Sequence, residues 1–143
     1  MFPASLIDPA TRQAYLQTQY HVHGDTPLTL QVGVANASLA ARYKALRVES
    51  CACITACNPL SQSLEACVNA DLHAAFADEL RQRSLRFIEG VGQHPSNRWP
   101  GEASYLVWGL SLQAAKEALG IRHQQNAFIW CGLDTVPQLI LLR

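Results

Sequence analysis

Most apolar residues of this chain fall in short runs of the length typical of β-strands. The first two runs alternate apolar with polar residues and flank Gly24-Asp-Thr-Pro27, so they predict a hairpin. The run from Cys51 to Cys57 has no polar residue except Thr55, which predicts a strand buried on both faces. The predicted strands cover residues 20–23, 28–33, 51–57, 85–90, 104–110, 126–131 and 138–142.

Other apolar residues recur at helical spacing. In the longest such segment, 64–83, an apolar residue returns at every fourth position, as on the core-facing side of a helix. The members of this stripe are Leu64, Val68, Leu72, Phe76 and Leu80. Shorter helices are predicted over 11–19, from Asn36 or Ser38 to about Arg47, and from Ser111 to Leu119, with the polar residues as N-caps.

The order of these elements indicates the fold class. Strands and helices interleave without the strict alternation of a doubly wound parallel fold. We therefore predict one α+β domain over residues 1–143, with a mixed, mostly antiparallel sheet and two to four helices packed on it. We expect residues 1–10 to be poorly ordered.

The composition narrows the possible partners. Hydrophobic residues make up 49% of the chain and charged residues only 15%, as in a well-packed globular protein. Eleven basic residues balance eleven acidic ones, so no overall field attracts nucleic acid. No stretch approaches the roughly 20 consecutive apolar residues that a membrane span needs. We expect neither a nucleic acid nor a membrane as a partner, and the sequence leaves the oligomeric state open.

The cysteines are informative about the cellular compartment and less so about a catalytic or metal-binding role. Five cysteines, an odd number in a chain that starts without a signal-like pattern, favour reduced thiols and a cytoplasmic location. Cys51, Cys53 and Cys57 would share one face of a straight strand, but structural zinc usually draws on paired C-x₂₋₄-C knuckles in turns. We interpret them as small buried hydrophobic residues, with Cys57 as a nucleophile the weaker alternative, and expect neither metal nor cofactor.

Uncharged polar residues gather where the central apolar run ends, a position at which α/β architectures place ligands. Thr55, Asn58 and Ser61 are the first candidates for contact with a ligand. Asn69 lies at the margin of the helical stripe that follows, and its amide needs partners such as Thr55 or Asn58. The structural alternative is that these residues only cap the helix and tie the loop together.

A second candidate group lies further along the chain. Glu102 is the only carboxylate in a stretch otherwise short of charge, between Trp99 and Ser104. Near an indole and partly desolvated, its pKa would rise toward the range used in general acid–base catalysis. Trp99 could stack on a flat ligand, and Gln125 and Asn126 could bind the edge of a base or an amide. Their structural alternatives are a strand-end cap for Glu102 and a helix terminus for the two amides.

Three blocks of sequence carry a resemblance to a known family. The first is Ile54-Thr-Ala-Cys-Asn-Pro59 with Ser61 and Asn69-x-x-Leu72, the second is Gly90-Val-Gly92 leading to Trp99-Pro-Gly-Glu102-x-Ser104, and the third is Gln125-Asn126-Ala127. In this order they resemble the bacterial family known as domain of unknown function 3293. The chain departs from the family at Cys57, where tryptophan is usual. The resemblance implies a compact α+β domain, usually standing alone, with no established activity.

Two hypotheses follow. In the first, the blocks meet in one concavity that binds an unknown small molecule, and the protein is an enzyme or a binding protein. Glu102 would then be the acid–base residue, with Thr55, Asn58, Ser61, Asn69, Trp99, Ser104, Gln125 and Asn126 around the ligand. In the second, the protein is a non-catalytic interaction or regulatory module whose polar residues are structural, and an exposed apolar patch near Trp99 or Trp108 would favour it.

Overall fold

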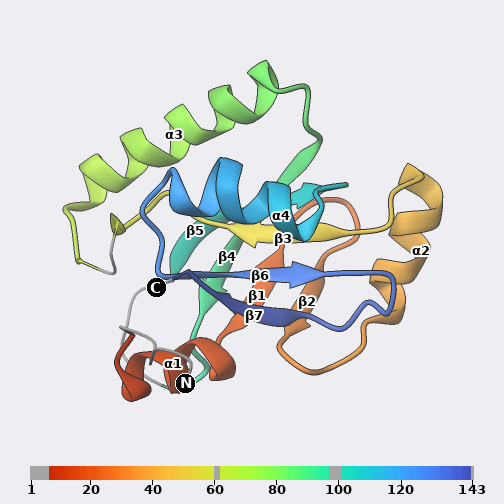
Figure 1. Ribbon diagram of the computed structural model, residues 1–143, viewed down its shortest axis with the longest axis horizontal. Helices are drawn as coiled ribbons and strands as arrows, with labels where there is room; N and C mark the ends of the chain where they lie inside the picture. Colours follow the sequence, from red (N-terminus) through yellow and green to blue (C-terminus); the bar gives the residue numbers. More distant parts are fainter. Residues whose placement is uncertain (1–6, 60–61, 97–100, 143) are drawn as a thin grey trace.

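One seven-stranded sheet organises the fold, with the strands in the order β2-β1-β4-β5-β3-β6-β7 (Figure 1). The computed structural model describes residues 7–59, 62–96 and 101–142. All six strand pairings in these ranges are antiparallel. The predicted α+β class is confirmed. The sheet was expected to be mixed and mostly antiparallel, and no parallel pair occurs among the described strands.

The bounds of the elements lie close to those predicted. The strands are β1 (Gln19–Val22), β2 (Leu28–Gln31), β3 (Cys51–Ile54), β4 (Phe87–Gln93), β5 (Glu102–Trp108), β6 (Ala127–Cys131) and β7 (Gln138–Leu141). The helices are α1 (Pro9–Gln17), α2 (Ala37–Leu46), α3 (Ala66–Gln82) and α4 (Leu112–Ala114), which continues as a π-helix over Ala115–Ile121. None of the helices within the described ranges is long and apolar enough to cross a bilayer.

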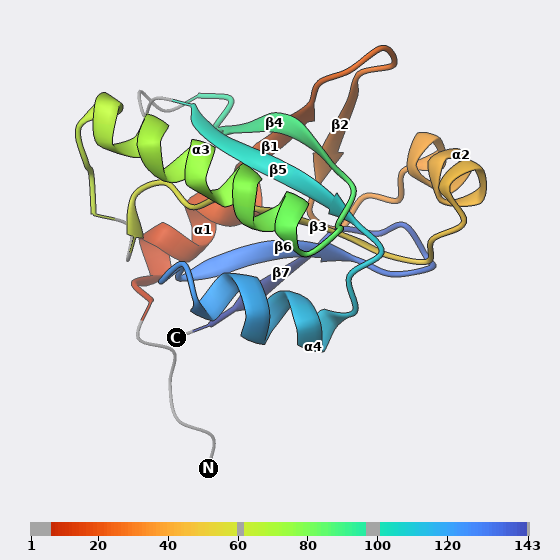
Figure 2. The ribbon, with the colours of Figure 1, turned by 90° about the horizontal axis from the view of Figure 1, so that it is seen from above.

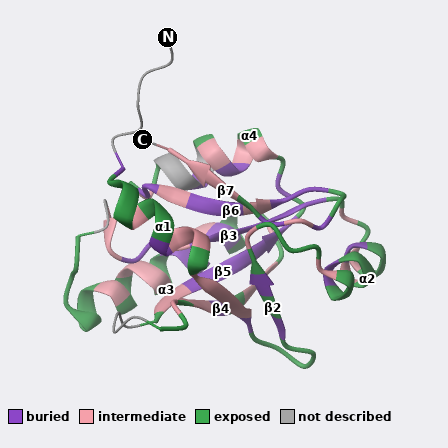
Figure 3. Cartoon of the chain, turned by 90° about the horizontal axis from the view of Figure 1, so that it is seen from below, coloured by how far each residue is buried: buried purple, intermediate pink, exposed green. Residues whose placement is uncertain are grey.

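The sheet is buried on both faces, as the apolar run in β3 predicted. Ala52 and Ile54 point to a core closed by Phe76 and Leu80 of α3 and by the last helix. Figure 2 shows α3 lying along β4 and β5 on this side. The alternate residues of β3 belong to a second core that α2 closes with Leu39 and Tyr43. In Figure 3, α1 lies across one end of the sheet.

The start of α3 corrects the predicted apolar stripe. The helix begins at Ala66, so Leu64 precedes it, and Leu64 and Val68 are 38% and 42% exposed. Only the second half of the stripe, Phe76 and Leu80, is fully buried, with Leu72 half-buried against the core. The backbone N–H of Leu64, ahead of the helix, donates to the side-chain oxygen of Asn58, 3.0 Å away.

The end of α3 explains why β4 begins later than predicted. Ser84 adopts a left-handed φ of 55°, and the backbone N–H of Leu85 donates to the carbonyl of Leu80. This bond is the closing bond of a Schellman motif, so Leu85 terminates the helix instead of opening a strand. The strand starts at Phe87 and continues to Gln93, three residues past the predicted end.

The predicted caps are present at two helices. Asn36 accepts from the backbone N–H of Leu39, and Ser111 accepts from that of Ala114. For α3 the residue at the cap position is Glu65, which makes no side-chain cap bond. Ser61, the cap expected there, lies outside the described residues.

Candidate functional site

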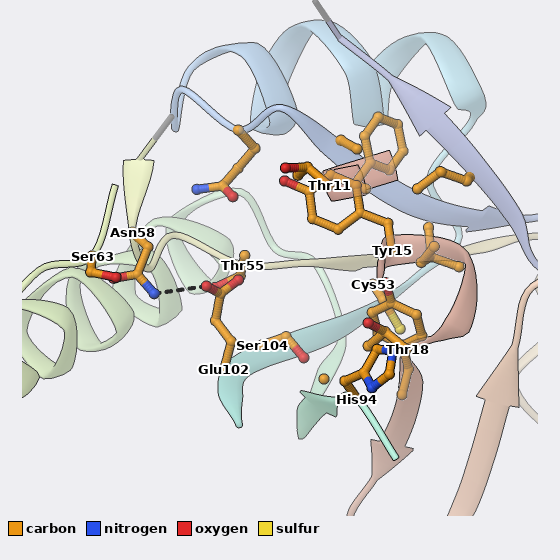
Figure 4. A pocket seen from close by; sticks show the side chains of 17 residues that line it. Thr11, Tyr15, Thr18, Cys53, Thr55, Asn58, Ser63, His94, Glu102 and Ser104 are labelled. Carbon is orange, nitrogen blue, oxygen red and sulfur yellow. Dashed lines mark hydrogen bonds between the residues drawn. The ribbon is translucent and has the colours of Figure 1, made fainter. Parts of the chain in front are cut away.

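A cavity of about 420 Å³ opens on the face of the sheet that α1 covers (Figure 4). Strands far apart in the sequence contribute its floor: Cys53 of β3, Ser104 of β5 and Ile129 of β6 lie on one face because side chains alternate along each strand. Thr11 and Tyr15 of α1 form a wall. The volume falls in the range of typical small-molecule pockets.

Asn58 connects two of the sequence blocks at one end of this cavity. Its side-chain N–H donates to Glu102 Oε2 at 2.8 Å, a bond drawn in Figure 4. Its side-chain oxygen accepts from Asn69 Nδ2 at 2.7 Å, and its backbone N–H donates to Asn69 Oδ1 at 2.9 Å. Asn58 adopts a left-handed φ of 46°, a conformation that asparagine tolerates better than most residues. The side chain of Glu102 is therefore positioned by a network that begins in α3.

Two further polar residues of the cavity are engaged by main chain. The hydroxyl of Thr55 donates to the carbonyl of Ala103 at 2.7 Å and accepts from the N–H of Cys57, which ends the ladder of β3. The amide of Gln125 donates to the carbonyls of Cys57 and His123, both at 3.2 Å. These bonds tie the ends of β3, β5 and β6 together, so both residues have a structural role besides lining the cavity.

Two oxygens on β5 have no protein partner within the described part of the chain. Glu102 accepts only through Oε2, and its Oε1 makes no hydrogen bond there. Ser104 is 8% exposed and lines the cavity, yet its hydroxyl also makes none. The two residues are two positions apart on one strand, so both side chains point to the same side. Neither oxygen is sealed off from solvent, so both are open to a ligand or water in the cavity.

Burial shifts the acid–base behaviour of the cavity. It raises the pKa of Glu102 above the ordinary value of 4.5, and the hydrogen bond from Asn58 offsets part of this shift because it stabilises the carboxylate. Burial also raises the pKa of Tyr20, and the nearby Cys53 and Glu102 add to it, so this phenol stays protonated. Burial likewise raises the pKa of Cys57, which disfavours the thiolate that a nucleophile requires.

The structure brings most of the predicted site residues together. The predicted residues that line the cavity are Thr55, Asn58, Glu102, Ser104 and Gln125. Asn69 does not line it but holds Asn58 from behind. Asn126 is 8% exposed and is not among the lining residues. Ser61 and Trp99 lie outside the described residues.

Sequence reasoning missed the aromatic wall. Tyr15 of α1 and Tyr20 of β1 line the cavity, and neither belongs to the three blocks. The sequence signal that could have pointed to Tyr20 is the glycine pair in β4, since a glycine in a strand leaves room for a bulky neighbour. In the structure, Gly92 pairs with Tyr20 on one side and with Glu102 on the other. A Cβ built at Gly92 would lie 3.3 Å from Tyr20 Cε1, so the glycine leaves room for the ring.

The cysteines do not form the single row that their spacing predicted. β3 ends at Ile54, so only Cys51 and Cys53 lie in the strand, and Cys57 follows it. All five cysteines are free thiols, and only Cys67 is exposed. Within the described ranges, no group of three or more His, Cys, Asp or Glu residues could hold a metal ion.

Comparison with known proteins adds a family. No curated protein and no solved structure matches the chain. The model of one family, described as "Protein of unknown function (DUF3293)", matches residues 54–128. This range is more than half of the 143 residues and contains every block on which the resemblance depended. The chain therefore belongs to the DUF3293 family.

Proposed function

We propose that the cavity is the binding site of a small organic molecule and that Glu102 is the residue that contacts its reactive or polar group. The observation that carries this proposal is a pair of oxygens, Glu102 Oε1 and Ser104 Oγ, that have no protein partner within the described residues and line a cavity of about 420 Å³. In a scaffold that only tied loops together, both oxygens would be hydrogen-bonded within the protein, as the single hydroxyl of Thr55 is.

The environment of Glu102 suits proton transfer. Its raised pKa brings the protonated and ionised forms closer in population at neutral pH, which is the condition that general acid–base catalysis exploits. Asn58 fixes the orientation of the carboxyl group. In a cytosolic setting, as the free thiols favour, the ligand would be a metabolite.

For the alternative, an interaction module, only one of the two tryptophans expected near an exposed apolar patch can be placed, since Trp99 lies outside the described residues. Trp108, one of the two residues expected near an exposed apolar patch, is 7% exposed and belongs to the core under α2. The exposed large hydrophobic residues among those described are Val34, Leu64, Val68 and Leu133.

Thermal-shift screening of a metabolite library tests the proposal, because a ligand that binds only the native state raises the melting temperature. The matched variant is Ala127→Phe, which adds a ring from β6 into the cavity. We expect at least one compound to stabilise the wild type and not this variant. If every stabilising compound acts equally on both proteins, the cavity is not the binding site.

Glu102→Gln gives a second test. We expect this variant to lose ligand binding while its free energy of unfolding changes by less than about 1 kcal/mol, because glutamine can still accept from Asn58. Because burial raises the folded-state pKa of Glu102, ionising this carboxyl lowers the free energy of unfolding. The wild type should therefore lose stability relative to the variant as pH rises from 4.5 through the folded-state pKa.

The matched control for this variant is Glu89→Gln on the neighbouring strand. The side chain of Glu89 is 60% exposed and does not line the cavity. The Glu89→Gln variant should therefore bind the ligand as the wild type does. A Glu102→Gln protein that binds the ligand as well as the wild type would contradict the role assigned to the carboxylate.

A further inference from the structure

The charge inventory of the cavity restricts what it can bind. Among the described lining residues Glu102 is the only acidic one, and none is a lysine or an arginine. Histidine is represented by His94. Its Nδ1 accepts from the backbone N–H of Ser96 and its Nε2 lies 2.9 Å from Gln17 Oε1. Glu102 is therefore the one carboxylate of the described wall, and no lysine or arginine is there to balance it.

Within the described ranges this carboxylate has no counter-charge. The hydrogen bond that it receives there comes from an uncharged amide, and burial disfavours its ionised form. A buried carboxylate is stabilised when a cation approaches its open oxygen, since Coulomb attraction strengthens as water is excluded. An anionic ligand would meet repulsion at the same place.

The rest of the wall suits an organic cation better than a bare ion. The rings of Tyr15 and Tyr20 line the cavity from α1 and β1. Aromatic faces attract organic cations and stack on flat groups. An inorganic cation would need several oxygen ligands, whereas within the described ranges the acidic and sulfur ligands form no group of three.

We propose that the cavity takes a small organic cation with a flat apolar body, an amidinium or a protonated amine, whose N–H groups donate to Glu102 Oε1 and Ser104 Oγ. This inference rests on the proposed binding function and names the ligand class for the same site. Asn58 holds the carboxylate in place, and the rings of Tyr15 and Tyr20 border the body of the ligand.

Three probes of nearly equal shape test the charge: benzamidine, which is positively charged at neutral pH, benzamide, which is neutral, and benzoate, which is negatively charged. NMR titrations of the full chain measure their affinities. We expect benzamidine to bind at least about tenfold more tightly than benzamide, and benzoate not to bind at concentrations up to about 10 mM.

Variants test which residues cause the preference for benzamidine over benzamide. In Glu102→Gln the advantage of benzamidine over benzamide should disappear, while Glu89→Gln should keep it. Ser104→Ala should weaken benzamidine by about three- to tenfold, because it removes one acceptor. Retention of the full preference in Glu102→Gln would overturn the assignment.

The outcomes separate this inference from the proposed function. If benzamide or benzoate binds at least as tightly as benzamidine, and Ala127→Phe abolishes that binding, the cation assignment is wrong and the binding site stands. If no probe binds, the cation assignment is likewise overturned. If the metabolite screen also yields no compound sensitive to Ala127→Phe, the binding function fails with it.

Discussion

At the scale of single residues, Asn58 combines a backbone and a side-chain role. Its left-handed φ turns the chain out of β3, and its amide joins Glu102, Asn69 and the backbone N–H of Leu64. The carboxylate at the floor of the cavity is thus coupled to the turn that leads toward α3.

Substitution at Asn58 separates the two roles. Asn58→Ala should lower the free energy of unfolding by about 2–4 kcal/mol, since alanine is strained at this φ and the partners lose their bonds. Asn58→Gly removes only the amide and should cost about 1–2 kcal/mol less. Urea denaturation measures the free energy of unfolding of both variants. Equal losses would mean that the backbone conformation carries no strain.

The two glycines of β4 make a matched pair of a different kind. A Cβ at Gly90 would lie 2.6 Å from the carbonyl oxygen of His21, whereas one at Gly92 would meet the Tyr20 ring at 3.3 Å. Main chain in a ladder cannot move aside, but a ring can. Gly90→Ala should therefore destabilise by about 1–3 kcal/mol and Gly92→Ala by less than about 1 kcal/mol.

The Gly92→Ala protein should show its effect in binding. Because Tyr20 must shift away from its place beside Glu102, we expect weaker binding of any cavity ligand with nearly unchanged stability. Thermal denaturation and ligand titration of the same samples compare the two readouts. A Gly92→Ala protein as unstable as Gly90→Ala would show that the Tyr20 ring is fixed.

At the scale of elements, α1 is the least anchored wall of the cavity. Ala14 is its buried residue, and its N-cap, Asp8, makes no side-chain cap bond. By contrast β3 is buried along its whole length and pairs with strands on both sides. Segments with few buried contacts open locally more often than central strands.

Hydrogen exchange tests this difference. The backbone amides of α1 should exchange about a hundredfold faster, or more, than those of β3 and β5. A compound bound in the cavity should slow exchange in α1, because Thr11 and Tyr15 line it, and change α2 little. Equal protection of α1 and β3 without ligand would show that α1 is a fixed part of the core.

At the scale of the whole molecule, the accessibility of the thiols tests how well the core is closed, since Cys51, Cys53 and Cys131 lie in the core on the α2 side of the sheet. Cys51, Cys53, Cys57 and Cys131 are buried, and Cys67 on α3 is exposed. An aromatic disulfide reagent such as dithiobis-nitrobenzoate should therefore label one thiol rapidly in the native protein and all five after denaturation. Cys67→Ser should abolish the rapid phase. Rapid labelling of Cys51, Cys57 or Cys131 would contradict the burial of these thiols; Cys53 is left out of this test because it lines the cavity.

Much of the fold follows from local pattern. The alternating runs located the strands within a few residues, and the uninterrupted apolar run in β3 predicted its burial on both faces. The stripe failed at Leu64 and Val68 because the period does not show where a helix begins or which of its turns packs on the core: α3 begins at Ala66, and Val68 in its first turn stays 42% exposed. The strand predicted to begin at Leu85 begins later because α3 ends through the left-handed conformation of Ser84. Serine is not a usual residue for that position, so nothing in the sequence indicated it.

The sequence by itself determined which segments form strands and helices and which polar groups stand at strand ends, because these depend on neighbours along the chain. The tertiary structure alone decided that Asn58 and Glu102, 44 positions apart, share a hydrogen bond. It did so because β3 and β5 are neighbours in the sheet, an order that no local period encodes. It also decided that a tyrosine of α1 and another of β1 complete the cavity, since that depends on how α1 docks on a folded sheet.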